Sequence, residues 1–397
     1  MMKTIQETAR ELAPQIRQLR EYIHSHPELS FEEKETAAFI SGKLREWGIP
    51  FTGGWAGTGI VAIVEGRNPG KTCTAVRAEL DALPIEEAGT AAYVSQNKGV
   101  MHACGHDVHM ASLLGVARML QLHKDEWEGT AKLIFQPGEE KHPGGGSLLL
   151  AEGVLQNPQV DRILALHVYP HLPAGVVGFR SGQYMASTDE IHITIRGKGG
   201  HAALPHQTID PVTIAAYTVV NLQQLVSRRS NPVVPCVLSF GKIAGGTVNN
   251  VIPDTVTLSG TLRTMDEGWR EEAHRLIAEV VNSTCAAWGA TADIEIPKGY
   301  PSLYNNPELT NTARALAETY LGPQNVKELS LRMTADDFAF YSHVVPGCYF
   351  RLGTASADGS SCTASVHTNT FDIDPSALET GAGLMTWLVM ELNKAAI

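Results

Sequence analysis

The sequence predicts an α/β protein with two parts: a mostly parallel sheet covered by helices, and a smaller inserted domain with helices on one face of an antiparallel sheet. Over residues 1–181, short apolar runs alternate with helical segments, which is typical of strands buried on both faces. From 182 to 297 the order becomes strand, helix, strand, strand, helix, strand, which is the ferredoxin-like order. Residues 298–397 then return to the first domain, with helices and one more buried strand.

The elements of the first domain follow from the spacing of its apolar residues. A first helix is expected to end at His26-Pro27, because proline disfavours a helical backbone in the residue before it. A second helix is expected over 32–47, where Gly48 stops it, and an almost wholly apolar helix over 110–122. Buried strands are expected at 60–64, 74–78, 133–135, 163–166 and 348–352.

The inserted domain is marked by a change of period. Residues 190–196 (EIHITIR) alternate between apolar and polar side chains, as in a half-exposed strand. Further strands are expected at 235–240, 255–262 and 292–296, and helices at about 210–227 and 266–288. This order places both helices on one face of an antiparallel sheet.

The composition narrows the class of protein. Of the 397 residues 43% are hydrophobic and 18% are charged, which predicts a folded chain. The net charge of −11 argues against a nucleic-acid or anionic-membrane partner, and no apolar run is long enough to span a membrane. The six cysteines are scattered without CxxC spacing and the first residues do not resemble a signal peptide, so we expect a cytoplasmic protein.

The densest group of chemically reactive residues is MHACGHDVH, at 101–109. Cys104 and His106 flank Gly105, and a tight turn there can aim both side chains at one point. Thiolate and imidazole are good ligands for divalent transition metals. A buried structural cysteine beside a surface histidine is the alternative, but three histidines this close favour a metal site.

Acidic residues follow two of the expected core strands. Glu139 and Glu140 come directly after the strand 133–135, where two adjacent carboxylates favour a cation. One can ligate while its neighbour takes the proton of a metal-bound water. Asp81 follows the strand 74–78 and suits a role in orienting a ligand histidine. A solvated loop and an acidic turn are the alternatives.

Two further histidines complete the candidate set. His167 ends the strand 163–166, where a lone histidine is more often a satisfied core residue, and His367 lies in a late loop. Together the candidate ligands are Cys104, His106, Glu140, His167 and His367. Because one metal needs about four ligands including water, five protein ligands with a bridging thiolate fit two metal ions. This donor set suits Zn²⁺, Mn²⁺, Co²⁺ or Ni²⁺ and does not choose among them.

Nearly the whole chain resembles the M20 metallopeptidase family, in particular its amidohydrolase branch of hippurate hydrolases, N-acetyl-diaminopimelate deacetylases and indole-acetyl-amino-acid hydrolases. The motifs that carry the resemblance are HPELS (26–30), AELDALP (78–84), HACGHD (102–107), FQPGEE (135–140), ALHVYP (165–170), GKGGHAALPH (197–206), GGTVNNVIPD (245–254), GTLRT (260–264) and HTNTFDID (367–374). The family often has Asp where this chain has Glu79, and a plain glycine-rich run where 141–143 (KHP) intervenes. Neither departure removes a candidate ligand.

The resemblance implies a two-metal catalytic domain with an inserted lid domain, and a homodimer formed through that lid. It implies that Cys104 bridges the metals, that the other four candidates also ligate them, and that Glu139 is the general base. On the lid, His201 would steady the oxyanion, while Asn250 and Arg263 would contact the substrate. The alternative for His201 is a surface residue beside a glycine turn, and Arg263 could instead pair with an acid on the lid.

The expected reaction is hydrolysis of a small N-acyl amino acid, for instance an acetyl or benzoyl derivative, to a carboxylate and a free amino acid. The nearest alternative is a dipeptidase or aminopeptidase of the same fold, which needs an acidic group for a free α-ammonium. A nucleotide-dependent oxidoreductase is disfavoured because 57–59 (GTG) precedes a strand and no third glycine completes GxGxxG. A non-catalytic binding protein is disfavoured because both glutamates of FQPGEE are present.

Overall fold

The computed structural model describes residues 1–394, and the chain divides into two units. The first contains Met1–Gly182 and two later segments that begin at Tyr304 and Asp337. The second contains Gln183–Leu303 and Leu331–Asp336. Among the helices of residues 1–394, none is both long and apolar enough to cross a membrane.

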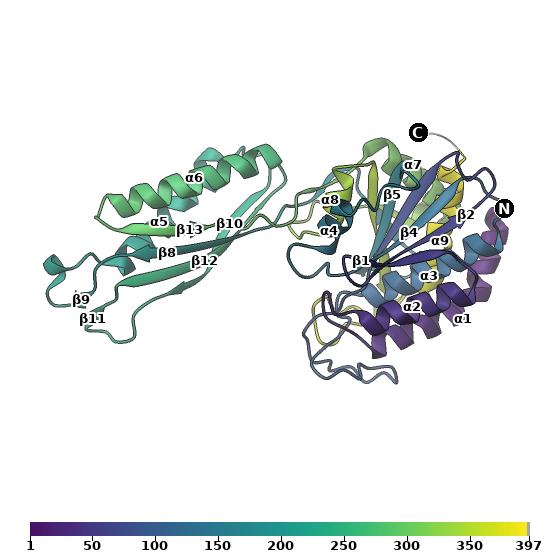
Figure 1. The fold of residues 1–397 in the computed structure, drawn as a ribbon, viewed down its shortest axis with the longest axis horizontal. Helices are drawn as coiled ribbons and strands as arrows, with labels where there is room; N and C mark the ends of the chain where they lie inside the picture. Colours follow the sequence, from purple (N-terminus) through teal and green to yellow (C-terminus); the bar gives the residue numbers. More distant parts are fainter. Residues whose placement is uncertain (395–397) are drawn as a thin grey trace. The chain divides into compact units, whose positions relative to one another are not determined.

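An eight-stranded sheet forms the centre of the first unit (Figure 1). Its strand order is β1 (Phe51–Trp55), β2 (Gly59–Glu65), β4 (Thr130–Gln136), β3 (Cys73–Glu79), β5 (Arg162–Pro173), β16 (Gly347–Ala355), β6 (Val177–Phe179) and β15 (Val326–Glu328). The four central strands β4, β3, β5 and β16 are parallel, as predicted. The strand predicted at 60–64 lies in β2, which pairs antiparallel with β4. No sequence pattern predicts β1, because its sequence FTGGW has two glycines and three exposed positions.

Helices cover both faces of this sheet (Figure 1). On one face lie α2 (Lys34–Glu46), α3 (His106–Leu122), α7 (Pro307–Leu321) and α9 (Ala377–Leu392), with α1 (Met2–Ser25) packed on α3 and α9. On the other lie α4 (Gly145–Ala151) and α8 (Phe338–Ser342). Alternate residues of β3 face the two layers: Val76 and Ala78 join the core under α3, while Arg77 reaches Asp337 beside α8.

The second unit is built on an antiparallel sheet of order β10-β12-β8-β13 (Figure 1). Its elements in chain order are β8 (Asp189–Arg196), α5 (Pro211–Gln224), β10 (Cys236–Ala244), β12 (Thr255–Thr264), α6 (Glu267–Ala286) and β13 (Thr291–Glu295). Two separate two-stranded sheets are formed by β9 (Gly200–His201) with β11 (Val251–Ile252) and by β7 (Gly182–Met185) with β14 (Leu303–Asn305). Along β8 the isoleucines at 191, 193 and 195 point into the apolar core and alternate with exposed or half-exposed residues. The predicted period of two in 190–196 is therefore confirmed.

The helices of the second unit start where their sequences provide a cap. Asp210 accepts a hydrogen bond from the Val212 N–H at 2.9 Å, and proline follows it at the first helical position. Asp266 accepts from the Trp269 N–H at 2.8 Å at the start of α6. Each helix therefore begins one residue after its predicted first residue, which is the acidic cap itself.

Candidate active site

The predicted site residues of the first unit gather where the central parallel strands end. β3 ends at Glu79 and β4 at Gln136, next to the segments that carry Asp81 and Glu139. His167, expected at the end of its strand, lies inside β5, which continues to Pro173, and is directly opposite Arg351 of β16. In α/β folds the carboxyl ends of parallel strands are where ligands bind.

A tight turn at the start of α3 aims Cys104 and His106 at one point. Gly105 between them has φ of 79°, a left-handed conformation that glycine adopts at low cost. A Cβ atom at this position would lie only 2.6 Å from a methyl carbon of Val168. The backbone can therefore approach β5 closely here, and the side chains of 104 and 106 are both buried.

The Cys104 thiol belongs to two overlapping groups of possible metal ligands. One group is Cys104, His106 and His167, and the other is Cys104, Glu140 and His367; within each, the ligand atoms lie within 4.8 Å of one another. The Cys104 Sγ is 3.4 Å from the His167 Nε2 and 3.2 Å from the His367 Nε2. A sulfur shared by two ligand sets is the geometry that a bridging thiolate between two metals requires.

In each of the two buried histidines Nδ1 contacts a backbone carbonyl oxygen, which leaves Nε2 for another partner. The His106 Nδ1 lies 2.8 Å from the Asp81 carbonyl oxygen and 3.3 Å from its carboxylate. The His106 Nε2 is buried and, among residues 1–394, has no hydrogen-bond partner. In His167, Nδ1 bonds the Val168 carbonyl at 2.8 Å. A buried nitrogen without a partner is costly, so this geometry fits a bound cation.

The electrostatic surroundings of the Cys104 thiol also favour a bound cation. Burial, followed by the negative charges of Glu140 and Glu139, raises the pKa of the Cys104 thiol. A thiolate here therefore needs nearby positive charge, which a divalent cation supplies. A donor set of one thiol, three imidazoles and one carboxylate suits transition metals better than Ca²⁺ or Mg²⁺.

His367 reaches the cluster from a loop late in the chain. Its N–H donates to the Ala103 carbonyl oxygen at 2.7 Å, which ties the loop to the HACGHD segment. Its φ of 64° is uncommon outside glycine, and such conformations cluster at functional sites. Its Nε2 lies 3.2 Å from the Glu140 Oε1, while half of the side chain remains exposed.

A buried network that no sequence motif indicated supports the cluster of candidate ligands. The His109 Nδ1 donates to Glu79 at 2.7 Å, and its Nε2 accepts the Val168 N–H at 3.0 Å. Both ring nitrogens are thus occupied, so His109 holds β5 in place and is not free to ligate. Arg77 bridges Glu79 and Asp337, which lie far apart in the sequence. No local pattern marks such long-range partners.

A second buried network anchors the start of α3. The Asp107 Oδ2 accepts from the Arg20 Nε at 2.6 Å and lies 2.8 Å from the His24 Nδ1. Burial alone would raise the pKa of the Asp107 carboxyl, but Arg20 and His24 lower it well below its usual range. Arg20 also bonds Asp372 at 2.9 Å, so one α1 side chain ties α3 to the segment after His367.

The remaining predicted site residues lie in the second unit. His201 is exposed in β9, opposite Val251 of β11, and its Nδ1 accepts the Ala203 N–H at 3.1 Å. Asn250 is exposed nearby, and its carbonyl oxygen accepts the Ala202 N–H at 3.0 Å. Arg263 is half-buried on β12, opposite Val237 of β10, and is not close to that pair in strand register.

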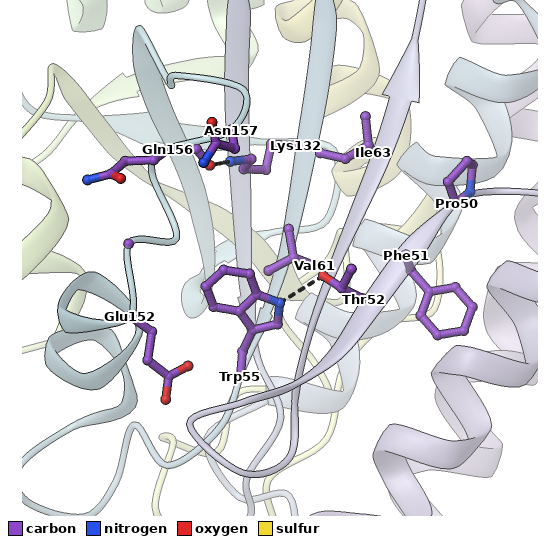
Figure 2. Close-up of a pocket in the computed structure, with 11 residues that line it drawn as sticks. Pro50, Phe51, Thr52, Trp55, Val61, Ile63, Lys132, Glu152, Gln156 and Asn157 are labelled. Carbon is purple, nitrogen blue, oxygen red and sulfur yellow. Dashed lines mark hydrogen bonds between the residues drawn. The ribbon is translucent and has the colours of Figure 1, made fainter.

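A hollow beside β1 is lined by none of the candidate site residues (Figure 2). Trp55, Val61 and Ile63 line it, and the Trp55 Nε1 donates to the Thr52 hydroxyl at 2.8 Å. The buried Lys132 ammonium donates to the carbonyl oxygens of residues 154, 156 and 158 at 2.6–2.9 Å. Its three N–H groups are therefore all used, and this lysine holds a turn.

Comparison with known proteins identifies the family. The family described as peptidase family M20/M25/M40 matches residues 75–391. The chain belongs to the M20 peptidase family. The predicted resemblance is thus confirmed, and membership makes the chain a hydrolase that acts on amide bonds.

Individual M20 relatives cover nearly the whole chain. "Thermostable carboxypeptidase 2" of Saccharolobus solfataricus is 37% identical over 384 residues, 96% of each chain. "N-acetyl-L-cysteine deacetylase" of Bacillus subtilis is 38% identical over 367 residues, which are 92% of this chain and 85% of the relative. Among solved structures, a Bacillus subtilis protein described as a dinuclear metal-binding peptidase of the M20 family has a TM-score of 0.83 and 31% identity, covering 98% of this chain and 100% of its own.

Proposed function

We propose that the chain is a metal-dependent amidohydrolase that cleaves N-acyl amino acids, with two divalent metal ions held by Cys104, His106, Glu140, His167 and His367. The observation that carries the proposal is the Cys104 Sγ, shared by two ligand groups. The solved M20 relative described as dinuclear supports two ions. The donor set leaves Zn²⁺, Mn²⁺, Co²⁺ and Ni²⁺ open.

The proposed chemistry divides between the metals and Glu139. Bound divalent ions polarise an amide carbonyl and lower the pKa of a bound water. The Glu139 carboxylate is buried, and its Oε2 lies 4.0 Å from the His106 Nε2. From there it would take a proton from the attacking water and pass it to the leaving nitrogen. Asp81 would hold the ring of His106 through the contacts at its Nδ1.

The second unit would act as the lid. Its strand order β13-β8-β12-β10 with helices α5 and α6 is that of a ferredoxin-like domain, which supports the predicted insertion. On it, His201 would stabilise the tetrahedral oxyanion, and Asn250 and Arg263 would contact the substrate. A guanidinium suits a carboxylate, which every N-acyl amino acid carries.

A carboxypeptidase activity is the second candidate, because a relative that covers 96% of the chain carries that name. The two reactions are related chemically: both break an amide bond next to a residue with a free α-carboxylate, and they differ in the size of the acyl side. A dipeptidase or aminopeptidase differs more, since it must also bind an α-ammonium group.

One panel of substrates separates these activities. The metal-stripped enzyme would be reloaded with each divalent ion and assayed for released amine on N-acetyl and N-benzoyl amino acids, on N-blocked peptides and on free dipeptides. We expect turnover of the simple N-acyl amino acids. Preference for blocked peptides would identify a carboxypeptidase, and preference for free dipeptides would contradict the proposed substrate class.

We further propose a homodimer formed through the second unit. β10 is an edge strand of the four-stranded sheet, and its unpaired edge can accept another strand. Exposed apolar side chains lie on it and on α5: Ile243 is 56% exposed, Tyr217 54% and Val220 64%. Sedimentation of the wild type and of Val220→Glu would test this, with a monomeric wild type contradicting it.

A cytoplasmic location is also proposed. All six cysteines are free in the structure, which supports a reducing compartment. Cell fractionation with an antibody to the native protein would test the location, and recovery outside the cytoplasm would contradict it.

A further inference from the structure

The segment 26–33 (HPELSFEE) joins α1 to α2 and contributes no candidate ligand. It nevertheless contacts both loops that carry the proposed ligands and base. The Glu28 carbonyl oxygen accepts the Ala82 N–H at 2.8 Å, so the segment runs beside the end of AELDALP. The Glu28 carboxylate accepts the Thr36 N–H at 2.8 Å at the start of α2, which anchors the segment to that helix.

Ser30 acts on the loop that orients His106. Its hydroxyl donates to the Asp81 Oδ2 at 2.6 Å, and the same oxygen accepts the Glu140 N–H at 2.9 Å. The Asp81 backbone carbonyl oxygen lies 2.8 Å from the His106 Nδ1, and the Asp81 Oδ1 lies 3.3 Å from the same nitrogen. Asp81 thus contacts the ring of one candidate ligand through its carbonyl oxygen and the backbone of another through its carboxylate, and the Ser30 hydroxyl holds that carboxylate.

Glu33 acts on the loop that carries the proposed base. Its side chain is fully buried, and its Oε1 accepts the N–H groups of Phe31 at 2.8 Å and Gly138 at 2.9 Å. Its Oε2 accepts the Thr58 hydroxyl at 2.6 Å. Gly138 is the residue directly before Glu139, so this bond sets the backbone from which the base projects.

The Phe31 ring packs closely against Gly138. Gly138 has φ of 59°, and a Cβ atom built there would lie 2.3 Å from the Phe31 ring. Phe31 itself has φ of 67°, which is unusual for a bulky residue. Its N–H bond to Glu33 holds it in that conformation. Ring and carboxylate together leave the Gly138 backbone little freedom.

We infer that Ser30 and Glu33 are positioning residues: Glu33 places the loop of the base Glu139, and Ser30 fixes Asp81, the residue whose carbonyl oxygen orients the ligand His106. This inference rests on the proposed function for the role of Glu139 and His106. It assigns these two side chains of the HPELSFEE segment a part in catalysis without contact with substrate. Displacing a reacting group by about 1 Å can cost on the order of 100-fold in rate. Loss of the Ser30 or Glu33 hydrogen bonds can therefore lower the rate even if the loops move only slightly.

The Glu33 test uses two variants that differ in hydrogen bonding. Glu33→Ala leaves the Gly138 N–H without its acceptor, whereas Glu33→Gln keeps Oε1 for both N–H groups and can donate to the Thr58 oxygen. Burial raises the pKa of the Glu33 carboxyl, so a neutral amide suits the site. We expect kcat per bound metal to fall about 10- to 100-fold in Glu33→Ala with KM nearly unchanged. Glu33→Gln should stay within about threefold of wild type, because its hydrogen bonds are retained.

Two controls separate positioning from loss of fold. Glu32→Ala removes an exposed neighbouring carboxylate and should leave kcat unchanged. Leu44→Ala removes a buried α2 side chain and should lower the melting temperature without lowering kcat per bound metal. The inference is overturned if Glu33→Gln is as impaired as Glu33→Ala, or if Glu33→Ala loses no more kcat than Leu44→Ala.

The Ser30 test measures metal binding, so it does not depend on the substrate. Ser30→Ala should weaken binding of Zn²⁺ or Mn²⁺ about 10-fold in competition with a chelator, as for other residues that orient ligands. Ser376→Ala removes an equivalent 2.7 Å hydroxyl–carboxylate bond, to Asp374 on the surface, and should leave affinity unchanged. Unchanged affinity in Ser30→Ala would overturn its role. If the wild type hydrolyses no N-acyl amino acid, the proposed substrate fails, while both tests still apply to any amide it cleaves.

Discussion

The two units bring their polar side chains into very different surroundings. In the first, Cys104, His106 and Glu139 are buried, and buried partners such as Asp81 and Glu79 surround them. In the second, the hydrophobic core is accompanied by a buried ion pair, Asp189 with Arg270, and the proposed contributors His201 and Asn250 are exposed. Buried partners therefore hold the reactive groups of the first unit in place, whereas the proposed contributors of the second unit are open to solvent.

The largest expected effect tests the buried half of this comparison. Glu139→Gln keeps the shape of the side chain but removes its basicity, so kcat should fall about 100- to 10,000-fold. Metal content, measured by elemental analysis, should stay at the wild-type value because Glu140 is intact. Glu140→Gln is the matched control and should lose metal. Full activity of Glu139→Gln would refute the base assignment.

A somewhat smaller loss of kcat is expected from changing the exposed His201 of the second unit. His201→Ala should lower kcat about 100- to 1000-fold, as removal of one oxyanion donor does, without changing metal content. His206→Ala removes another exposed histidine from the same segment and serves as the control. If the two variants have the same kcat in a steady-state assay, the proposed role of His201 in stabilising the oxyanion is contradicted.

Removing the metals should affect the two units unequally. A metal present at about 100 times its Kd contributes about 2.7 kcal/mol to stability, and a chelator abolishes that contribution. Hydrogen exchange followed by mass spectrometry should show faster exchange in 101–110 and 136–142 of the first unit, and no change in β8 and β12. An equal increase in hydrogen exchange in both units would contradict this prediction.

The smallest effect concerns a charge cluster inside the second unit. Burial opposes ionisation of Asp189, but hydrogen bonds from Arg270 and His274 lower its pKa to about 2. Because its folded pKa lies below the ordinary value of 3.8, its stabilisation is present above pH 4 and is lost as the pH falls toward 2. Asp189→Asn should therefore cost about 1–3 kcal/mol at pH 6, and the difference from wild type should shrink between pH 4 and 2.

That prediction is checked by denaturant unfolding at several pH values. Asp293→Asn is the control, since its ion pair with Arg196 lies on the surface and should contribute little. A pH-independent difference for Asp189→Asn would mean that shape, and not charge, explains the loss.

Local sequence patterns were sufficient for most of the secondary structure. The apolar run at 110–122 predicts α3, but the helix starts at His106, because its first turn is polar and yet buried. β1 has no apolar pattern and forms by pairing with β2. Elements with a strong period were therefore found, and those that depend on a neighbour were not.

The sequence by itself determined the two kinds of hydrophobic period and the presence of thiol, imidazole and carboxylate groups after core strands, because both are properties of neighbouring residues. Only the tertiary structure decided that Cys104 joins two ligand groups, that His109 has no free nitrogen, and that Ser30 holds Asp81. Each of these depends on hydrogen bonds or close contacts between residues far apart in the chain. Such partners are selected by packing, which no local pattern records.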